Sequence, residues 1–552
     1  MPTLAIDGKQ ITVPAGTTVI QAAEKLGIFV PRYCYHPGLS IAGNCRICLV
    51  EIEKTPKLQI ACNTPVADGM VVHTQNSKVN QGREAVLEFL LINHPLDCPV
   101  CDQSGECDLQ NFYMQYGLYD ARFREQKVKK AKAVPIGPTV MLDAERCVLC
   151  SRCVRFTDEI TKTGELGIFH RGDEAEIGLY PGTELNNKYS GNVVDICPVG
   201  ALTDRDFRFK ARVWYLKSAP SVCTGCSQGC NIDVHYVLDR PHLADGARVM
   251  RLKPRYNPEV NQWWMCDEGR YGYKAIDQGR LRKVLHRGVE TNWETALAEL
   301  ADSLKKVKLQ GSQAQVGILP SAQLTNEELF LIRKLFKDLV GIEKCDVQVP
   351  AQLGSSDKFL IKADKNPNTM GAVLIGFPGA SFDAPFTLSQ SKGERLAQDG
   401  RHAGSILELA LSGQIKMLWV FGHDLVKLLG AEKVKRLADS LELFVFQGPN
   451  ENGTSRYAHW VLPSAAAVEK DGTFVNCHGR VQRVFKVFEP LTESRADWQI
   501  VLDLARRLEV AIPEQSLEQI FTALGNSVPA FSGLTYEKVG LQGAVIGLAA
   551  SE

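Results

Sequence analysis

The sequence lacks an excess of charge of either sign. Its 552 residues include 63 Lys and Arg and 63 Asp and Glu, so the formal net charge is zero. Binding to nucleic acid over a broad surface requires a basic excess, so we expect no nucleic-acid partner. Apolar residues make up 45% and charged residues 23% of the chain. This composition excludes wholesale disorder and predicts a globular protein of several domains.

Long apolar runs are also missing. The longest, such as residues 417–421 and 544–550, fall far short of the ~20 residues that span a bilayer. The opening residues, MPTLAIDGKQ, do not combine a basic segment with an apolar one, so we expect no signal peptide. The sequence thus predicts an intracellular chain that meets a membrane only through a partner.

Two nucleotide-binding patterns are absent as well. No G-x-G-x-x-G opens a helix after a strand, and the sequence has no Walker A motif. Because no nucleophile–base motif lies among the cysteine groups, we expect no complete active site and no catalytic residue in this chain. A two-electron carrier should therefore sit on another polypeptide.

Cysteine is abundant in the first half and scarce in the second. Of 17 cysteines, fifteen lie within residues 1–275. An odd number in an intracellular chain argues against a disulfide framework, so we expect metal ligation. The two others, Cys345 and Cys477, are isolated, and we expect each to be a small buried hydrophobe.

The first cysteine group follows a segment that we expect to begin a β-grasp fold. Asp7-Gly8 predicts a hairpin turn, and Thr17-Thr18 and Gly27 predict the two ends of a helix. Four thiolates suit a [2Fe–2S] centre, although plant-type ferredoxins use the different spacing C-x4-C-x2-C. A four-thiolate zinc site is the alternative. The C-x10-C-x2-C-x13-C array consists of Cys34, Cys45, Cys48 and Cys62.

A helix expected over residues 79–93 leads into the second group. Three thiolates and one imidazole can bind zinc or a [4Fe–4S] cluster, and the residues alone leave both open. An imidazole carries less negative charge than a thiolate, so it would shift the potential of a cluster. The H-x3-C-x2-C-x5-C array consists of His94, Cys98, Cys101 and Cys107.

The third group has the spacing of a bacterial ferredoxin in stretched form. A C-x2-C-x2-C run is followed, after 43 intervening residues, by a Cys-Pro pair. In two-cluster ferredoxins the Cys-Pro cysteine ligates the other cluster. No second run lies next to it here, so we assign all four thiolates to one [4Fe–4S] cluster, with zinc as the alternative. The array consists of Cys147, Cys150, Cys153 and Cys197.

The fourth group is a C-x2-C-x3-C run closed by a cysteine after 35 intervening residues. Gly225 and Gly229 fit a tight loop around a [4Fe–4S] cluster, and zinc is again the alternative. The array consists of Cys223, Cys226, Cys230 and Cys266. Four clusters without a catalytic motif indicate a path for single electrons.

After about residue 276 the pattern changes to alternating strands and helices. Thr291 with Glu294, and Thr325 with Glu328, are interpreted as capping boxes at the starts of two helices. Strands that alternate with helices predict an α/β domain with a parallel sheet. The expected strands are residues 315–319, 373–375, 418–421 and 443–446.

In their order and spacing, the four arrays resemble those of the large iron–sulfur G subunit of bacterial respiratory complex I (NADH:quinone oxidoreductase). Local strings agree as well: residues 43–46 (GNCR), 94–99 (HPLDCP) and 265–272 (MCDEGRYG). The resemblance is strong over residues 1–275. Further on, residues 469–476 (EKDGTFVN) and 479–482 (GRVQ) resemble molybdopterin oxidoreductases. The G subunit carries such a domain without its cofactor.

The resemblance implies a fold class and a set of cofactors. We expect α+β iron–sulfur modules followed by an α/β molybdopterin-oxidoreductase-like domain. They would hold one [2Fe–2S] cluster, three [4Fe–4S] clusters and no molybdopterin, because no cysteine stands in register to ligate molybdenum. The expected boundaries are 1–78 for a [2Fe–2S] ferredoxin-type domain, 79–120 for the one-His, three-Cys module, 121–217 for a [4Fe–4S] ferredoxin-like module, 218–275 for the four-Cys module and 276–552 for the α/β domain.

The resemblance also implies partners and a location. The second and third arrays would lie on the main electron path from flavin to quinone, and the fourth off that path. The partners would be a subunit that holds FMN and oxidises NADH, a small [2Fe–2S] subunit and the quinone-side iron–sulfur subunits. The chain would be peripheral, on the cytoplasmic side of the bacterial inner membrane, in a complex that translocates protons.

Three other functions stay open at the level of the sequence. Similar arrays occur in the electron-transfer subunits of soluble NAD-linked hydrogenases, formate dehydrogenases and bifurcating complexes. A catalytic molybdenum enzyme is a further alternative. The last is an interaction protein in which the arrays are structural zinc sites and the α/β half binds partners.

Overall fold

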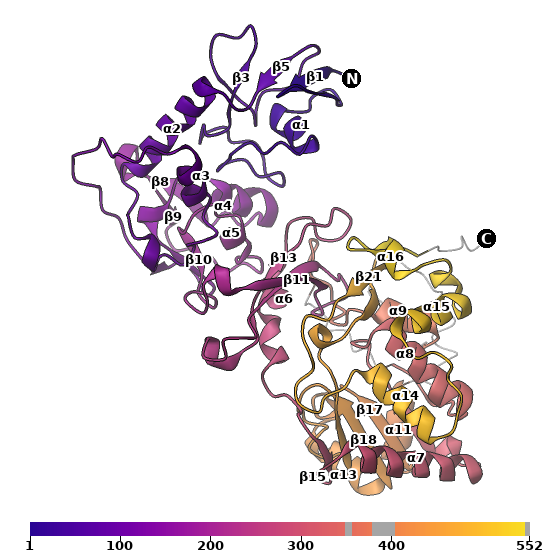
Figure 1. Ribbon diagram of the computed structural model, residues 1–552. Coiled ribbons are helices and arrows are strands. Elements are labelled where there is room, and N and C mark those ends of the chain that lie inside the picture. The colour runs from indigo at the N-terminus through magenta and orange to yellow at the C-terminus, as the bar shows by residue number, and fades with distance from the viewer. Residues whose placement is uncertain (348–355, 378–402, 547–552) are drawn as a thin grey trace. The chain divides into compact units, whose positions relative to one another are not determined.

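The computed structural model describes residues 1–347, 356–377 and 403–546 (Figure 1). The chain divides into two compact units, and each is described by itself. The first comprises Met1–Leu216 and Val237–Gly246, and the second comprises Lys217–Tyr236 and Ala247–Glu552. No helix among the described residues is long and apolar enough to cross a membrane.

The first unit begins with a five-stranded sheet and one helix, as the β-grasp expectation requires. The central strands β1 and β5 are parallel, and the outer pairs are antiparallel. Asp7 and Gly8 have φ angles of 46° and 81°, which form the predicted hairpin turn between β1 and β2. In order across the sheet the strands are β2 (Lys9–Thr12), β1 (Thr3–Ile6), β5 (Val71–His73), β3 (Leu49–Ile52) and β4 (Gln59–Ile60).

Helix α1 (Val19–Lys25) packs on this sheet through Val19, Ile20, Ala22 and Ala23. Thr18 is its N-cap, and the Thr18 backbone N–H donates to Gln21 Oε1 at 3.0 Å. Gly27, with a φ angle of 72°, lies just beyond the helix end. Both predicted ends of this helix are confirmed.

The rest of the first unit consists of short elements joined by long loops. Helix α2 (Ser77–Leu91) starts two residues before the expected point, because Asn76 Oδ1 caps the Val79 N–H at 2.9 Å. The other elements are α3 (Asp108–Tyr116), β6 (Val134–Pro135), β7 (Val140–Leu142), α4 (Arg152–Arg155), β8 (Leu166–Phe169), β9 (Glu176–Leu179), α5 (Asn192–Asp195) and β10 (Leu202–Asp204).

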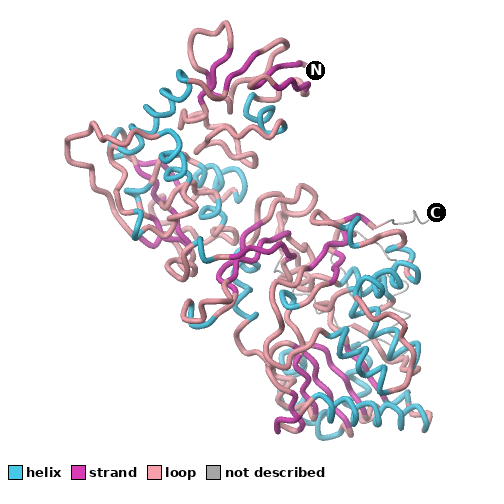
Figure 2. The backbone as a smooth tube through the Cα atoms, in the orientation of Figure 1, coloured by secondary structure: helices cyan, strands magenta, loops and turns pink. Residues whose placement is uncertain are grey.

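The second unit contains the expected α/β domain (Figure 2). Its six-stranded sheet has four parallel strands in the order β19, β18, β17, β16, extended by the antiparallel strands β14 and β15. The bounds are β14 (Val284–His286), β15 (Val289–Thr291), β16 (Val316–Leu319), β17 (Met417–Phe421), β18 (Leu443–Gly448) and β19 (Trp460–Pro463).

Helices cover both faces of this sheet. Trp419 and Phe421 of β17 belong to one hydrophobic cluster, and their neighbours Leu418 and Val420 belong to another. This alternation places successive side chains on opposite faces, as a sheet buried on both sides requires. The helices are α7 (Trp293–Leu309), α8 (Asn326–Ile332), α9 (Thr369–Ile375), α11 (Ala403–Leu411), α12 (Leu425–Leu429), α13 (Ala431–Ser440), α14 (Asp497–Arg507), α15 (Leu517–Ser527) and α16 (Tyr536–Val539).

Two small antiparallel sheets complete the second unit. The first precedes the α/β domain in sequence and is followed by helix α6 (Asp267–Tyr271). Its strands are β11 (Lys217–Val222), β12 (Asn231–Tyr236) and β13 (Val249–Pro254). The strands of the other sheet are β20 (Gly472–Val475), β21 (Arg480–Val484) and β22 (Ala544–Val545).

Two local expectations for the α/β domain are wrong. The apolar residues 373–375 do not form the expected strand; they form the last turn of α9, which Gly376 ends with a φ angle of 108°. A run of three apolar residues cannot distinguish a strand from a buried helix. Helix α7 begins one residue later than its proposed capping box, because Asn292 Oδ1 caps the Thr295 N–H at 2.9 Å. The second capping box, Thr325 with Glu328, is confirmed.

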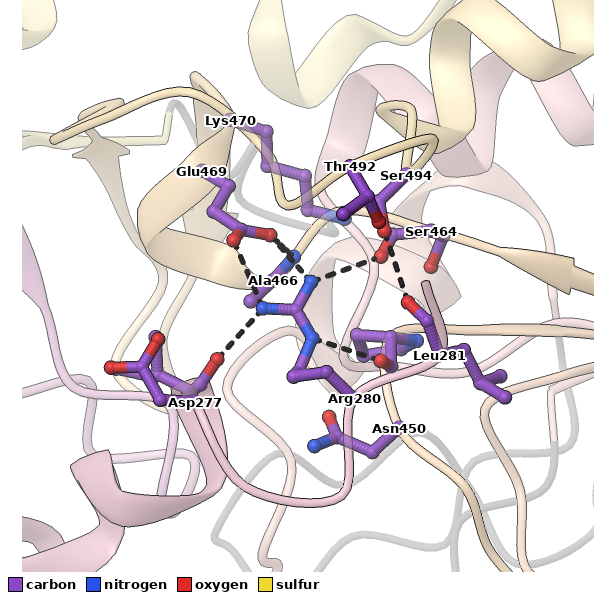
Figure 3. A network of polar contacts seen from close by, with 12 residues as sticks. Asp277, Arg280, Leu281, Asn450, Ser464, Ala466, Glu469, Lys470, Thr492 and Ser494 are labelled. Atoms are coloured by element: carbon purple, nitrogen blue, oxygen red, sulfur yellow. Dashed lines mark hydrogen bonds and ion pairs between the residues drawn. The ribbon is translucent and has the colours of Figure 1, made fainter. Parts of the chain in front are cut away.

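A buried ion pair lies inside the second unit (Figure 3). The side chains of Arg280 and Glu469 are both 0% exposed, and two hydrogen bonds of 2.9 and 2.6 Å join them. Glu469 also accepts from Arg248 Nη2 and from the Ala466 N–H, each at 2.7 Å. The pair thereby connects the segment that follows the fourth cysteine array with the chain just before β20.

Candidate metal centres

Each sulfur atom of the first array contacts at least one other sulfur of the set. Hydrogen bonds join Cys34 to Cys45 and to Cys62, and Cys62 to Cys48, so the contacts run in a chain. These bonds lower the pKa of the Cys34 thiol and raise that of Cys45. The bond to Cys62 likewise lowers the pKa of Cys48, so the set favours the thiolate form at Cys34 and Cys48, and thiolates are the form that ligates a metal.

The thiols of the second array come from the segment between α2 and α3. Cys98 begins a single 3-10 turn, and the Cys101 N–H donates to the Cys98 carbonyl at 3.1 Å. Cys107 is the N-cap of α3, so the N–H groups of Leu109 and Gln110 in the first turn face its sulfur. Such N–H groups stabilise negative charge on sulfur.

His94 lies near Asp97, which directly precedes Cys98 of this array. Burial lowers the pKa of the imidazole to about 4; nearby Asp97 opposes this shift and Arg146 adds to it. The ring is therefore neutral near pH 7, which is the form that ligates a metal. Its membership of the ligand set stays a prediction.

All four cysteines of the third array line one small cavity. Leu149 and Ser151 adopt left-handed φ angles of 51° and 59°, which bend the C-x2-C-x2-C loop around this cavity. The Leu149 N–H lies 3.3 Å from Cys147 Sγ. Burial raises the pKa of Cys147 and of Cys197, each to about 12. Their thiolates therefore need a metal to offset the cost of burial.

All four cysteines of the fourth array line a second small cavity, in the second unit. The Gly225 N–H faces Cys223 Sγ at 3.5 Å, and the Gly269 N–H faces Cys266 Sγ at 3.3 Å. A Cβ atom on Gly269 would lie only 2.9 Å from Cys223 Sγ. Glycine at this position thus leaves the room that a cluster between the thiolates needs.

The donors in these sets fit iron–sulfur clusters. The thiols are buried or half-buried, they surround shared cavities in the third and fourth arrays, and backbone N–H groups point at their sulfurs. The zinc alternative requires several ligands around one ion. In the part of the chain that the structure describes, no group of three or more His, Cys, Asp or Glu is arranged to hold a single metal ion.

The first three arrays meet in one hydrophobic cluster of the first unit. Tyr33, Leu87, Leu109 and Phe112 are buried at its centre. The array members that belong to it or pack against it are Cys34, Cys45, Cys107, Cys147, Cys150 and Cys197. Cysteines from three separate stretches of sequence therefore share one core.

Two side chains connect the first array with the third. The Arg155 guanidinium donates to the Cys34 carbonyl at 2.5 Å and to the Cys150 carbonyl at 3.3 Å. Asn44 Nδ2 donates to the Leu149 carbonyl at 3.1 Å. Because these bonds tie the two ligand loops together at the backbone, they fix the distance between the two thiol sets.

The third array is connected to the second in the same way. Arg146 makes two hydrogen bonds to the Asp97 carboxylate, at 3.1 and 2.6 Å, and the Arg146 side chain is 4% exposed. A Cβ atom on Gly200 would lie 2.3 Å from Cys101 Sγ. The third array thus contacts both of the others. Sequence reasoning missed these connecting residues, although Asp97 and Arg146 each directly precede a cysteine of an array.

The two isolated cysteines have different surroundings. Cys345 is 3% exposed within the main hydrophobic cluster of the α/β domain, as expected. Cys477 is only partly buried, and its N–H donates to the carbonyl of Ser227, next to the fourth array, at 2.8 Å. The expectation of a buried hydrophobe is therefore wrong for Cys477, because β20 delivers it to the edge of this array.

A larger cavity of about 460 Å³ lies beside the fourth array, at the carboxyl ends of β17, β18 and β19. This end of a parallel sheet is where α/β proteins bind ligands. Lys470 on its wall is already paired, at 2.7 Å with Glu328 and at 3.1 Å with Asp497. Its charge is thus compensated within the protein.

Several buried thiol sets, three of them in one core, define this chain as an iron–sulfur electron carrier. Family models match it in the order expected. They are a 2Fe-2S iron–sulfur cluster binding domain (residues 1–77), the NADH-ubiquinone oxidoreductase-G iron–sulfur binding region (83–122), the NADH-quinone oxidoreductase subunit 3 ferredoxin-like domain (137–203), the molybdopterin oxidoreductase Fe4S4 domain (216–278) and molybdopterin oxidoreductase (387–507).

Relatives match nearly the whole chain. It is 33% identical to the G subunit of NADH-quinone oxidoreductase from Rickettsia bellii, over 96% of this chain and 90% of that protein. It is 32% identical to the mitochondrial NADH-ubiquinone oxidoreductase 78 kDa subunit of Candida albicans, over 95% of this chain and 85% of that protein. The chain therefore belongs to the family of NADH-quinone oxidoreductase G subunits, the electron-transfer subunits of complex I, and the resemblance is confirmed.

A solved structure of NAD+-reducing [NiFe]-hydrogenase in the H2-reduced state is 29% identical, over 38% of this chain and 91% of that chain. Its TM-score is 0.35, and no argument rests on so low a value.

Proposed function

We propose that this chain carries single electrons inside NADH:quinone oxidoreductase, from the subunit that oxidises NADH toward quinone, and that its first three arrays are the route. The observation that carries this proposal is the hydrophobic cluster that the three arrays share. A common core holds the redox sites close together and excludes water from the space between them. The iron–sulfur clusters would supply one-electron chemistry.

We assign the ligands as the spacing predicts. We keep the five domain boundaries expected from the sequence. The first array would hold a [2Fe–2S] cluster, and each of the other three would hold a [4Fe–4S] cluster. The ligands are Cys34, Cys45, Cys48 and Cys62; His94, Cys98, Cys101 and Cys107; Cys147, Cys150, Cys153 and Cys197; and Cys223, Cys226, Cys230 and Cys266.

The contacts support an order for the route. Arg155 and Asn44 join the third array to the first, and Arg146 and Gly200 join it to the second. We infer that electrons pass from the first array to the third and then to the second. The first array then faces the flavin side, and the second, with its imidazole ligand, faces the quinone side.

The fourth array would lie off this route. It belongs to the second unit, and none of its cysteines is part of the cluster that the other three arrays share. We propose that its cluster stabilises the junction with the α/β domain. That domain would keep the molybdopterin-oxidoreductase fold without the cofactor, because the Lys470 charge in its cavity is compensated by the protein itself.

The partners follow from the same proposal. They are the subunit that holds FMN and binds NADH, a small [2Fe–2S] subunit and the quinone-side iron–sulfur subunits. The chain would be attached to the cytoplasmic side of the inner membrane through these partners.

Alanine variants of one cysteine in the third array and one in the fourth test the proposal. We expect Cys150→Ala to abolish NADH-to-quinone electron transfer in assembled complex, because it removes a ligand on the route. Cys226→Ala should keep most of the transfer but lower the thermal stability of the second unit. Cys345→Ala, which removes a cysteine in the core of the α/β domain outside the arrays, is the control for electron transfer.

Metal content gives a second, independent measurement. The anaerobically purified chain should contain about 14 iron atoms, with little zinc and no molybdenum.

Two outcomes would contradict these proposals. Equal loss of electron transfer in Cys150→Ala and Cys226→Ala, with intact assembly, would contradict the off-route position of the fourth array. Low iron with two or more zinc atoms after reconstitution would overturn the whole proposal.

A further inference from the structure

Tyr33 lies in the cluster that the first three arrays share. Its side chain is 0% exposed, and its ring packs against Phe112 of α3 with the centroids 5.3 Å apart. It directly precedes Cys34 of the first array in sequence. The same hydrophobic cluster contains Cys107 of the second array. The ring is therefore buried in the core that both cysteine sets share.

The hydroxyl of Tyr33 is fully buried and has no hydrogen-bond partner among the residues that the structure describes. Folded proteins rarely leave a buried donor without a partner, because the donor loses its hydrogen bonds to water on burial and gains none in return. The titratable neighbours that act on this hydroxyl are, in order of strength, Cys107, Asp108 and Cys45. A tyrosine hydroxyl carries its proton near pH 7, so it is available as a donor here.

The missing acceptor can be identified by its chemistry. Cys107 is the N-cap of α3, where backbone N–H groups already face its sulfur. A thiolate or sulfide at this position has lone pairs left for a further donor. A cluster held by Cys107 would supply the acceptor that the hydroxyl lacks.

We propose that the Tyr33 hydroxyl donates a hydrogen bond to a sulfur of the second-array cluster at Cys107 and thereby sets its reduction potential. The inference rests on the proposed assignment of a [4Fe–4S] cluster to that array. A donor to sulfur stabilises the reduced cluster, which carries one more negative charge than the oxidised one. Removing the donor therefore makes reduction harder.

The test is a redox titration of each cluster, followed by electron paramagnetic resonance, in the assembled complex. We expect Tyr33→Phe to keep the second-array signal and to shift its one-electron equilibrium roughly tenfold toward the oxidised form. For a one-electron couple this corresponds to a fall in midpoint of about 59 mV. Tyr116→Phe is the matched control, because Tyr116 packs on the same cluster and its hydroxyl accepts a bond from Arg83 Nη1 at 3.1 Å.

A Cys107→Ala variant separates this inference from the assignment on which it rests. Loss of one [4Fe–4S] signal in Cys107→Ala establishes the assignment, whatever Tyr33→Phe does. An unchanged midpoint in Tyr33→Phe would overturn the inference, as would a shift confined to the [2Fe–2S] signal.

A second substitution keeps the test decisive if Tyr33→Phe fails to load the second-array cluster. 3-Fluorotyrosine placed at position 33 keeps the shape of the side chain and makes the hydroxyl a stronger donor. We expect a rise in the midpoint of the second-array cluster, and an unchanged midpoint would refute the hydrogen bond.

Discussion

Replacing Glu469 by glutamine tests how the fourth array is fixed to the α/β domain. The carboxylate accepts two hydrogen bonds from Arg280, one from Arg248 and one from a backbone N–H, at 2.6–2.9 Å. Glu469→Gln keeps the volume and removes the charge, so Arg280, at 0% exposure, is left without its counter-ion. Removing one partner of a buried pair costs about 3–5 kcal/mol.

Hydrogen–deuterium exchange of the full chain measures this cost locally. At about 1.4 kcal/mol per factor of ten, the expected loss corresponds to exchange that is faster by roughly two to four powers of ten. The increase should appear in peptides that cover residues 276–280 and 464–475. Glu509→Gln, which breaks a pair with Lys305 at the surface, is the control and should leave exchange there unchanged. Acceleration of less than tenfold in Glu469→Gln would refute the reasoning.

Two further substitutions address the first unit. His94→Cys should keep its cluster and lower the midpoint, because a thiolate adds negative charge; an unchanged redox titration would count against His94 as a ligand. Gly200→Ala should reduce iron loading and weaken the signals of the second and third arrays, because its Cβ would lie 2.3 Å from Cys101 Sγ. Gly272→Ala, whose Cβ would meet no atom within 4 Å, should load normally. Full occupancy in Gly200→Ala would show that this contact is unimportant.

Features that depend on neighbouring residues could be predicted from the sequence. The Asp7-Gly8 turn and the Thr325 capping box each depend on residues a few positions apart, and both are confirmed. The cysteine spacings belong to the same kind of pattern, since each loop must wrap its own site. The strand at 373–375 failed because such a short apolar run carries no period of its own.

Contacts between distant segments could not be predicted in this way. The hydrogen bonds of Arg146 to Asp97 and of Arg155 to Cys34 span 49 and 121 positions. The sequence also could not predict that the Tyr33 hydroxyl lacks a hydrogen-bond partner, because this depends on the burial of the ring. The sequence therefore predicts which residues gather at each array, whereas the relation between the arrays requires the fold.

The single core that unites three of the arrays has a consequence for how this family can change. A substitution that disturbs one of these ligand sets is transmitted to the other two, because Arg155, Arg146 and Gly200 connect them directly. The three sets must therefore be inherited together. The fourth set has its own cavity within the second unit. With the fourth set off the route, as proposed, a lineage could gain or lose that set alone and keep the electron route intact.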